Sequence, residues 1–356
     1  MTRMHASFAR PAATIPAPFR VNALFLWVLL LAAAFAPVQA ARADQRYADF
    51  VIDAHSKEVL HEEAADEARY PASLTKMMTL YLLFEAIDRG QVKLEERMTA
   101  SREAALQPPS KLGIVAGGTI SVEDAIKALV TRSANDVAVV IAEHLAGTQD
   151  RFASKMTAKA RELGMSRTRF VNASGLPSPL QQTTARDMAT LGQALIEDYP
   201  QFYGYFQTPS IKWGRLYARN HNNLLGKVEG VDGIKTGYTR ASGFNLVSSV
   251  ERDGARIIAV VMGGETALAR DNQMRYLIDQ SFQTLQARGP NAARFAALPL
   301  ERPAFDQAEL RGARPGAVAP GAGTVAQGSA GDEDALARAA EVIRQAEGDE
   351  GEGEAD

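Results

Sequence analysis

The sequence predicts an α/β fold in which helices flank a mainly antiparallel sheet, with a helical subdomain inserted between two blocks of strands. Short apolar runs bounded by turn residues occur near residue 50 and again after residue 230. Between them, apolar residues recur at helical spacing. This order, strands, then helices, then strands and a last helix, is typical of helices packed on one sheet.

The strands follow from alternation and turn signals. Residues 50–54 and 59–60 form a predicted hairpin around His55-Ser56-Lys57. A strand is expected at 231–239, and residues 244–251 and 256–262 form a second hairpin. Asp253-Gly254 joins that hairpin and favours a tight turn.

The helices follow from periodicity and end signals. Gly90 and Gly147 close two of them, and Ser121 begins another in the manner of a capping box. Thr183 or Thr184 caps a further one. The predicted helices are residues 72–89, 121–130, 135–145, 185–197 and 267–288.

The N-terminus reads as a cleaved secretory signal, residues 1–43. Arg3, Arg10 and Arg20 precede or flank an apolar stretch, 21–36, and small residues follow it. An uncleaved membrane anchor is the alternative, but the stretch is shorter than the ~20 residues that a span needs. Export to the periplasm is therefore expected, and the absence of cysteine from the sequence suits that compartment.

The C-terminus differs in composition from the rest. Residues 290–356 are rich in Pro, Gly, Ala and Glu, and 331–356 hold ten acidic and two basic side chains. We expect a low-complexity, disordered acidic tail, with a docking segment as the alternative. Because this segment is short and polar, we expect no amphipathic C-terminal membrane anchor in it. The folded part is thus 44–289, with a helical subdomain at about 95–200.

Three short strings carry the chemistry: Ser73-Leu74-Thr75-Lys76, Ser133-Ala134-Asn135 and Lys235-Thr236-Gly237. Each string occurs once. Ser73 and Lys76 lie on one face of a predicted helix near its N-terminus. A neutral Lys76 could act as the general base for attack by the Ser73 hydroxyl. Burial and a second cation, Lys235, would both favour the neutral form.

The other two strings suit substrate placement. Asn135 offers donors and an acceptor for an amide, and the Ser133 hydroxyl can relay a proton to a leaving amine. Asn135 could also simply cap a helix. Lys235 and Thr236 at a strand edge can meet a terminal carboxylate, while Gly237 lets an extended peptide lie close.

Other chemistry is poorly supported. No pair of histidines has metal-ligand spacing, so we expect no metal and no cofactor. A Ser-His-Asp triad lacks the G-x-S-x-G elbow. No basic patch indicates a nucleic-acid partner.

The chain resembles the D-alanyl-D-alanine carboxypeptidases, which are low-molecular-mass penicillin-binding proteins, over about residues 45–290. The three strings carry the resemblance, together with Gly243-Phe244-Asn245, the turn at 262–264 and Arg270. It implies the penicillin-binding and β-lactamase-like fold. It also implies removal of the terminal D-Ala from peptidoglycan pentapeptide through an acyl-serine, with β-lactams as inhibitors.

The resemblance also assigns roles. Ser73 would be the nucleophile, Lys76 the base, and Ser133 and Asn135 the relay and placement residues. Lys235, Thr236 and Arg270 would hold the substrate carboxylate. Backbone N–H groups of Ser73 and Tyr238 would form the oxyanion hole. Tyr238 stands where some members have His, which puts the rate of ester hydrolysis in doubt.

Two alternatives remain open. A DD-endopeptidase would use the same residues on peptidoglycan cross-links, and a non-catalytic peptidoglycan-binding protein would keep a relict site. A class A β-lactamase is disfavoured because no E-x-x-L-N-type string lies between Ser133 and Lys235.

Overall fold

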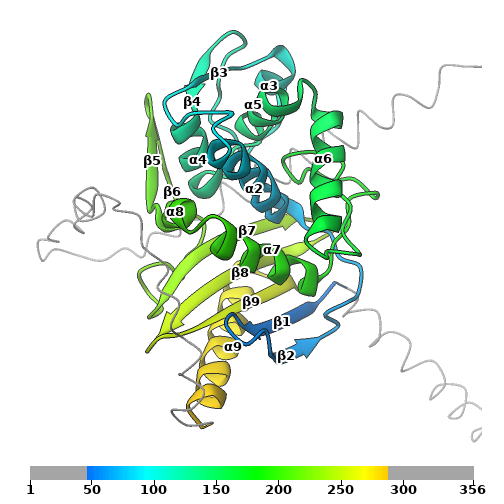
Figure 1. Cartoon of the computed structure of the whole chain (residues 1–356), viewed down its shortest axis with the longest axis vertical. Coiled ribbons are helices and arrows are strands. Elements are labelled where there is room, and N and C mark those ends of the chain that lie inside the picture. The colour runs from blue at the N-terminus through cyan, green and yellow to red at the C-terminus, as the bar shows by residue number, and fades with distance from the viewer. Residues whose placement is uncertain (1–45, 288–356) are drawn as a thin grey trace, which may run out of the picture. The chain divides into compact units, whose positions relative to one another are not determined.

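A five-stranded antiparallel sheet forms the centre of residues 46–287, the part of the chain that this computed structural model describes (Figure 1). The strand order is β2-β1-β9-β8-β7, with each neighbouring pair antiparallel. The strands are β1 (Ala48–Asp53), β2 (Val59–Glu63), β7 (Val231–Thr239), β8 (Gly243–Arg252) and β9 (Ala255–Gly264). One edge is therefore β7 and the other is β2.

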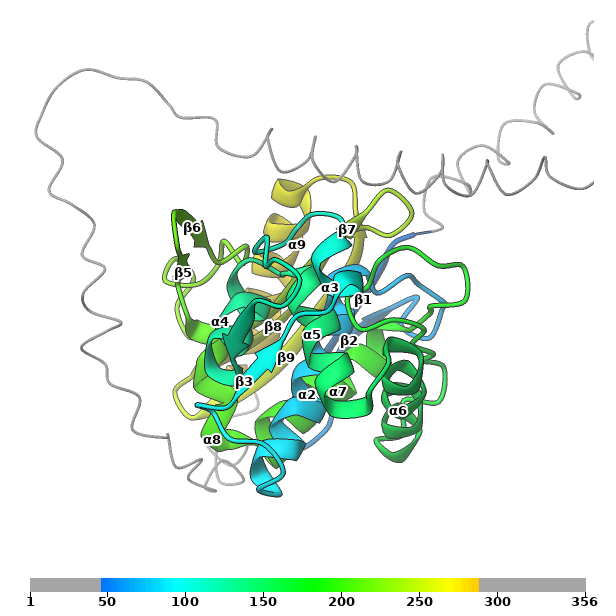
Figure 2. The same ribbon diagram turned by 90° about the horizontal axis from the view of Figure 1, so that it is seen from above.

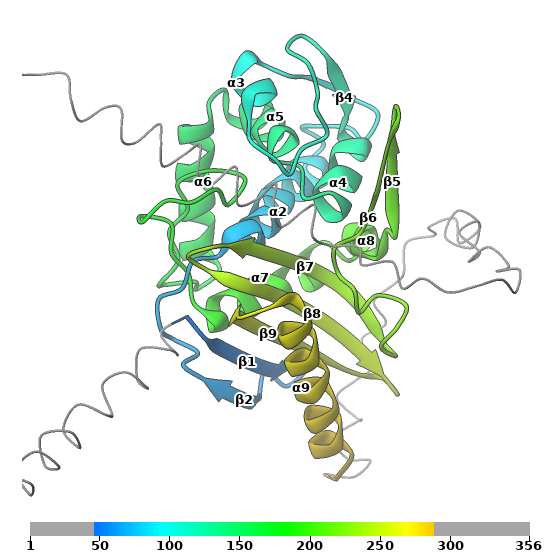
Figure 3. The same ribbon diagram turned by 180° about the vertical axis from the view of Figure 1, so that it is seen from behind.

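Successive residues of the central strands face opposite layers, as a pleated strand requires. In β1, Phe50 and Ile52 pack into the larger core, whereas Val51 packs into a second, smaller core. The smaller core lies under α9 (Ala267–Ala287), which crosses that face of the sheet (Figure 3). Both faces of the sheet are thus buried, which explains the nearly continuous apolar sequence of β9.

The opposite face carries α7 (Ala185–Asp198) and, beyond it, α2 (Thr75–Asp88) (Figure 1). A short 3₁₀ turn, η1 (Ala72–Leu74), leads directly into α2. Almost every side chain of α2 is buried, since neighbouring helices cover it on several sides. The helix that bears the predicted base is therefore held rigidly in the middle of the molecule.

The inserted subdomain contains α3 (Arg102–Leu106), α4 (Val122–Thr131), α5 (Asn135–Ala146) and α6 (Gln149–Glu162), as Figure 2 shows from above. It is not all-helical as expected. A two-stranded ribbon, β3 (Arg97–Thr99) with β4 (Thr119–Ser121), is part of it. The opposed residues Met98 and Ile120 of this ribbon are completely buried, so the ribbon contributes to the core.

A last segment connects α7 to β7. It comprises α8 (Pro200–Tyr203), the 3₁₀ turn η2 (Gly204–Gln207), and a second ribbon of β5 (Ser210–Trp213) with β6 (Leu216–Arg219). The rings of Phe84 in α2 and Phe202 in α8 stack with centroids 5.1 Å apart. This contact ties the segment to the helical core.

The predicted end signals act as expected. The side chains of Ser121 and Thr184 accept hydrogen bonds from the N–H groups of Asp124 and Asp187, three residues on. Asp253 and Gly254 both have positive φ, 51° and 77°, as a two-residue hairpin turn requires. The predicted strands and helices are confirmed with small changes of boundary, and the sequence analysis missed α3, α6 and α8.

The predicted signal segment and acidic tail lie outside the described residues. Within residues 46–287, no helix is both long and apolar enough to cross a membrane.

Candidate active site

Ser73 lies in η1, at the point where the chain turns into α2. The preceding residue, Ala72, has a left-handed conformation with φ of 47°, which is uncommon for a residue with a side chain. The backbone at Gly175 approaches this turn closely. An ideal Cβ on Gly175 would lie 1.9 Å from the carbonyl oxygen of Ala72, so only glycine fits there. The position of the serine is thus fixed by close backbone packing.

Lys76 is completely buried, and its Nζ has three oxygen neighbours. They are Ser73 Oγ at 3.1 Å, Asn135 Oδ1 at 2.8 Å and the carbonyl oxygen of Ser174 at 2.5 Å. The structure therefore brings together Ser73, Lys76 and Asn135, which are up to 62 residues apart in the sequence.

The direction of the lysine lone pair follows from these contacts. Asn135 Nδ2 donates a 3.0 Å hydrogen bond to the carbonyl of Pro108, which turns its Oδ1 toward Lys76. Asn135 Oδ1 and the Ser174 carbonyl can only accept. A neutral amine uses its two hydrogens on these acceptors. Its lone pair then faces the third neighbour, the hydroxyl of Ser73, which can donate to it.

The environment also favours the neutral lysine. Burial lowers the pKa of Lys76 well below its usual value, and the charge of Lys235 lowers it further. The carboxylate of Asp136 acts in the opposite direction. The two causes that the sequence suggested are thus both present, and burial is the larger.

Ser133 lies in the connection between α4 and α5 with a positive φ of 58°. Its side chain is buried, and among the described residues its Oγ has no hydrogen-bond partner. A buried hydroxyl without a partner is costly unless a ligand or water satisfies it. Asn135 is the first residue of α5, and Ala134, not Asn135, occupies the N-cap position.

Lys235 and Thr236 lie on the edge strand β7. Lys235 is 1% exposed, and its Nζ donates a 2.9 Å hydrogen bond to the carbonyl of Thr236. Burial, with a contribution from the nearby charge of Arg270, lowers the pKa of Lys235 to about 7. A buried cation with one hydrogen-bond partner is well suited to an incoming carboxylate.

Gly237 packs directly against η1. An ideal Cβ at this position would lie 2.9 Å from the backbone nitrogen of Ser73 and 3.1 Å from that of Leu74. The missing side chain therefore lets β7 approach the backbone of Ser73. The expected close approach of a substrate peptide to Gly237 stays a prediction. The ring of the next residue, Tyr238, packs against that of Phe244, with ring centroids 4.2 Å apart.

Arg270 lies in the first turn of α9 and is 3% exposed. Its Nε donates to Asp271 Oδ1 at 2.7 Å, and one terminal nitrogen donates to the carbonyl of Asn245 at 2.8 Å. Burial lowers the pKa of Arg270. The guanidinium is thus held on β8 next to Lys235, and its contact with a substrate carboxylate stays a prediction.

The sequence analysis missed two groups that shape the site. The buried carboxylate of Asp136 accepts hydrogen bonds from four backbone N–H groups, those of Leu112, Gly113, Ile114 and Val137. An aspartate directly before the apolar run 137–142 was the signal for it. The Ser174 carbonyl is a backbone group, so no residue type could have revealed it.

Comparison with known proteins agrees with this geometry. The family model described as D-alanyl-D-alanine carboxypeptidase matches residues 37–266, which is more than half of the chain. The chain belongs to the D-alanyl-D-alanine carboxypeptidase family. The serine-type peptidase that the motifs predicted is therefore confirmed at the level of the family.

Relatives and solved structures give the same result. D-alanyl-D-alanine carboxypeptidase DacC of Escherichia coli is 36% identical over 274 residues, 75% of this chain and 68% of DacC. The crystal structure of penicillin-binding protein 5 from Haemophilus influenzae matches with a TM-score of 0.65 and 32% identity, over 66% of this chain and 70% of that one. Penicillin-binding protein D2 from Listeria monocytogenes, in an ampicillin-bound form, matches with a TM-score of 0.61 and 32% identity over 67% and 98%. The predicted penicillin-binding fold is confirmed.

Proposed function

We propose that this chain removes the terminal D-Ala from peptidoglycan pentapeptide stems through an ester on Ser73. One observation carries the proposal: the amine of Lys76, buried and depressed in pKa, lies 3.1 Å from Ser73 Oγ. Two obligate acceptors hold the amine so that its lone pair faces the hydroxyl. That is the arrangement an activated nucleophile needs.

In the acylation step, Ser73 Oγ attacks the carbonyl between the two D-alanines while its proton passes to Lys76. The backbone N–H groups of Ser73 and Tyr238 stabilise the resulting oxyanion. The C–N bond then breaks, and the free hydroxyl of Ser133 relays a proton to the leaving amine of D-Ala. Water hydrolyses the ester in a second attack and regenerates Ser73.

The substrate lies along β7 in this proposal. Because β7 is an edge strand, an extended peptide can pair with its backbone. The terminal carboxylate lies at Lys235 and Thr236, with Arg270 behind them. β-Lactams, which imitate acyl-D-Ala-D-Ala, acylate the same serine, in line with the ampicillin-bound relative.

The proposed place of action is the periplasm. In this proposal residues 1–43 direct export and are then cleaved. The charge pattern of that segment and the family's cell-wall substrate support this proposal. Cell fractionation with N-terminal sequencing of the mature protein tests it. Recovery of the full-length chain from the cytoplasm alone would contradict it.

Release of D-Ala from a synthetic pentapeptide tests the activity. Wild-type protein should release one D-Ala per stem, and Ser73→Ala protein should release none above background. Equal release by both proteins would refute the proposal. Digestion of purified cross-linked muropeptide in parallel separates the two peptidase activities, because an endopeptidase yields monomers and a carboxypeptidase leaves the cross-link intact.

A further inference from the structure

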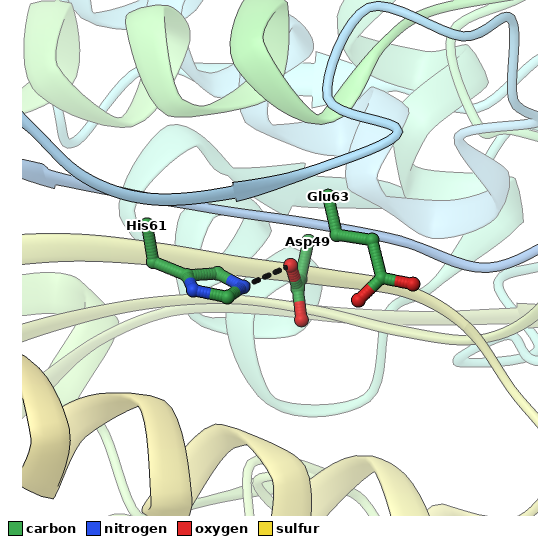
Figure 4. Close-up of side chains that lie close together, drawn as sticks. All are labelled: Asp49, His61 and Glu63. Atoms are coloured by element: carbon green, nitrogen blue, oxygen red, sulfur yellow. Dashed lines mark hydrogen bonds and ion pairs between the residues drawn. The ribbon is translucent and has the colours of Figure 1, made fainter.

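Three side chains that could bind a metal ion lie close together at the sheet edge opposite the active site. Asp49 of β1 and His61 and Glu63 of β2, the Asp49 cluster, place one ligand atom each within 4.8 Å of one another. Figure 4 shows the imidazole and the two carboxyl groups turned toward a common point between the sheet and α9. Elsewhere in residues 46–287 no other such group occurs.

The strand register explains the convergence. Asp49 is paired with Glu63, and Val51 with His61, so all three cluster members share the α9 face of the sheet. Histidine spacing in the sequence could not indicate this arrangement, since the ligands come from two strands. The hairpin itself therefore builds the cluster.

No lysine or arginine side chain of the described residues balances the negative charge of the two carboxylates in the cluster. The side chain of Asp49 is completely buried, yet no lysine or arginine in the described part of the chain pairs with it. Its carboxylate instead meets His61 Nε2 at 2.9 Å. Glu63 lies directly opposite Asp49, a like-charged cross-strand pair that destabilises a sheet. Within residues 46–287, the side chain of Glu63 forms no hydrogen bond and no ion pair.

Neighbouring groups hold Asp49 in place, as is usual for metal-binding carboxylates. The hydroxyl of Tyr47 donates to Asp49 Oδ2 at 2.5 Å, and Gln273 Nε2 of α9 donates to the same oxygen at 3.1 Å. Asp49 Oδ1 is left with His61 as its partner. The carboxylate is thus oriented from two sides, with its second oxygen directed at the imidazole.

We propose that the Asp49 cluster is a binding site for Zn²⁺, or for another divalent transition metal of similar preference, that clamps the β1–β2 hairpin beside α9. One imidazole with two carboxylates suits zinc, whereas Mg²⁺ and Ca²⁺ prefer oxygen ligands alone. Three protein ligands leave one tetrahedral position for water. The ion replaces the contact between His61 and Asp49 and neutralises both carboxylates.

The site is structural, and it is independent of the proposed peptidase activity. It lies at the β2 edge of the sheet, whereas Ser73 packs on β7 at the other edge. Bound metal should therefore stabilise the fold without changing acylation of Ser73. Zinc at hundredfold excess over its Kd should raise the Tm by at least about 4 °C.

Isothermal titration of tag-free, metal-stripped protein with ZnCl₂ tests the proposal. We expect one zinc per chain, at least about a tenfold loss of affinity in His61→Ala and in Glu63→Gln, and no binding of MgCl₂. His61 and Glu63 are at least partly exposed, so both variants should fold, which circular dichroism checks. His55→Ala is the matched control, since it removes a histidine from the same hairpin but from outside the cluster.

A second measurement guards against zinc bound elsewhere. Cobalt in place of zinc should give the visible absorption of a low-symmetry, four-coordinate ion in wild type and His55→Ala, and not in His61→Ala. No zinc bound by wild type, or equal affinity in wild type and His61→Ala, would overturn the proposal. The Asp49 cluster would then be a carboxylate–histidine ion pair only.

Discussion

Gly237 and Ser73 are in backbone contact across two elements of the fold: a Cβ on Gly237 would lie 2.9 Å from the nitrogen of Ser73. The three nearest neighbours of that Cβ, in Ser73, Leu74 and Pro71, are all main-chain atoms, which cannot rotate away as a flexible side chain can. The edge strand and the turn bearing the nucleophile are thus positioned by direct contact. The spacing between Ser73 and the N–H of Tyr238 depends on this contact.

Gly237→Ala should therefore separate β7 from η1 by a few tenths of an ångström or more. Because the proposed oxyanion hole spans the two elements, we expect acylation by a β-lactam to slow by about 10²-fold, the usual cost of losing one oxyanion donor. Stopped-flow measurement with a chromogenic cephalosporin gives this rate. Gly254→Asn is the control, because that glycine lies in a hairpin turn with no atom within 4 Å of its Cβ position. An unchanged rate in Gly237→Ala would show that the spacing is not critical.

Asp136→Asn should destabilise the protein and shift the dependence of kcat/KM on pH. Oδ2 of Asp136 accepts from the N–H groups of Gly113 and Ile114, and an amide nitrogen there would face two donors. We expect the free energy of unfolding to fall by roughly 2–5 kcal/mol in urea denaturation. Loss of the negative charge also lowers the pKa of Lys76, so the acid limb of kcat/KM should move to lower pH.

The control for this variant is Asp124→Asn. Asp124 lies in the first turn of α4, is half-buried and accepts from the hydroxyl of Ser121. Its loss should cost about 1 kcal/mol or less and leave the pH profile unchanged. Equal effects of the two variants would mean that Asp136 has no special part in shaping the site.

Lys235→Arg should remove the decrease of kcat/KM at alkaline pH, which we call the alkaline limb. The pKa of Lys235 is about 7 in the free enzyme, so the charged form that binds a carboxylate is lost as the pH rises above 7. The kcat/KM for D-Ala release from pentapeptide should fall accordingly. An arginine stays charged, so the variant should have a lower but flat kcat/KM between about pH 7 and 9. The same alkaline limb in both proteins would assign it to another group.

Lys235→Met should make the protein more stable at neutral pH, by an amount that depends on pH. Because the pKa of Lys235 is lowered to about 7 by folding, the unfolded chain binds a proton between about pH 7 and 10.5 that the folded chain lacks. The contribution of Lys235 to the stability of the wild type therefore rises with pH across that window. The advantage of the variant, a few kcal/mol at pH 7, should shrink toward zero near pH 10.5. A difference in unfolding free energy that does not vary with pH would contradict the lowered pKa.

The sequence predicted most of the elements because their signals are local. Ser121, Thr184 and Asp253-Gly254 act on neighbouring backbone groups, so their effects can be read without knowledge of the fold. Helix α6 was missed because its sequence is polar, and only Phe152, Ala153, Met156 and Ala160 face the core. The ribbons β3–β4 and β5–β6 depend on pairing that short segments do not reveal.

In the site, residue types were predictable and their backbone partners were not. Two of the three motifs identified Ser73, Lys76 and Asn135, and the structure brings these residues together. The carbonyls of Ser174 and Pro108 orient Lys76 and Asn135. Because every residue has a backbone carbonyl, the residue types could not indicate these contacts. The Asp49 cluster likewise appears only once the register of β1 and β2 is known.

The most direct test of the account is the mass of the intact protein after incubation with ampicillin. A β-lactam ring opens without losing atoms, so the wild type should gain the full mass of one ampicillin, and peptide mapping should place it on Ser73. Lys76→Met should acylate about 10²–10⁴-fold more slowly, and Ser73→Ala should gain nothing. Folded wild-type protein that never gains this mass, or an adduct that persists in Ser73→Ala, would contradict an acyl-serine mechanism.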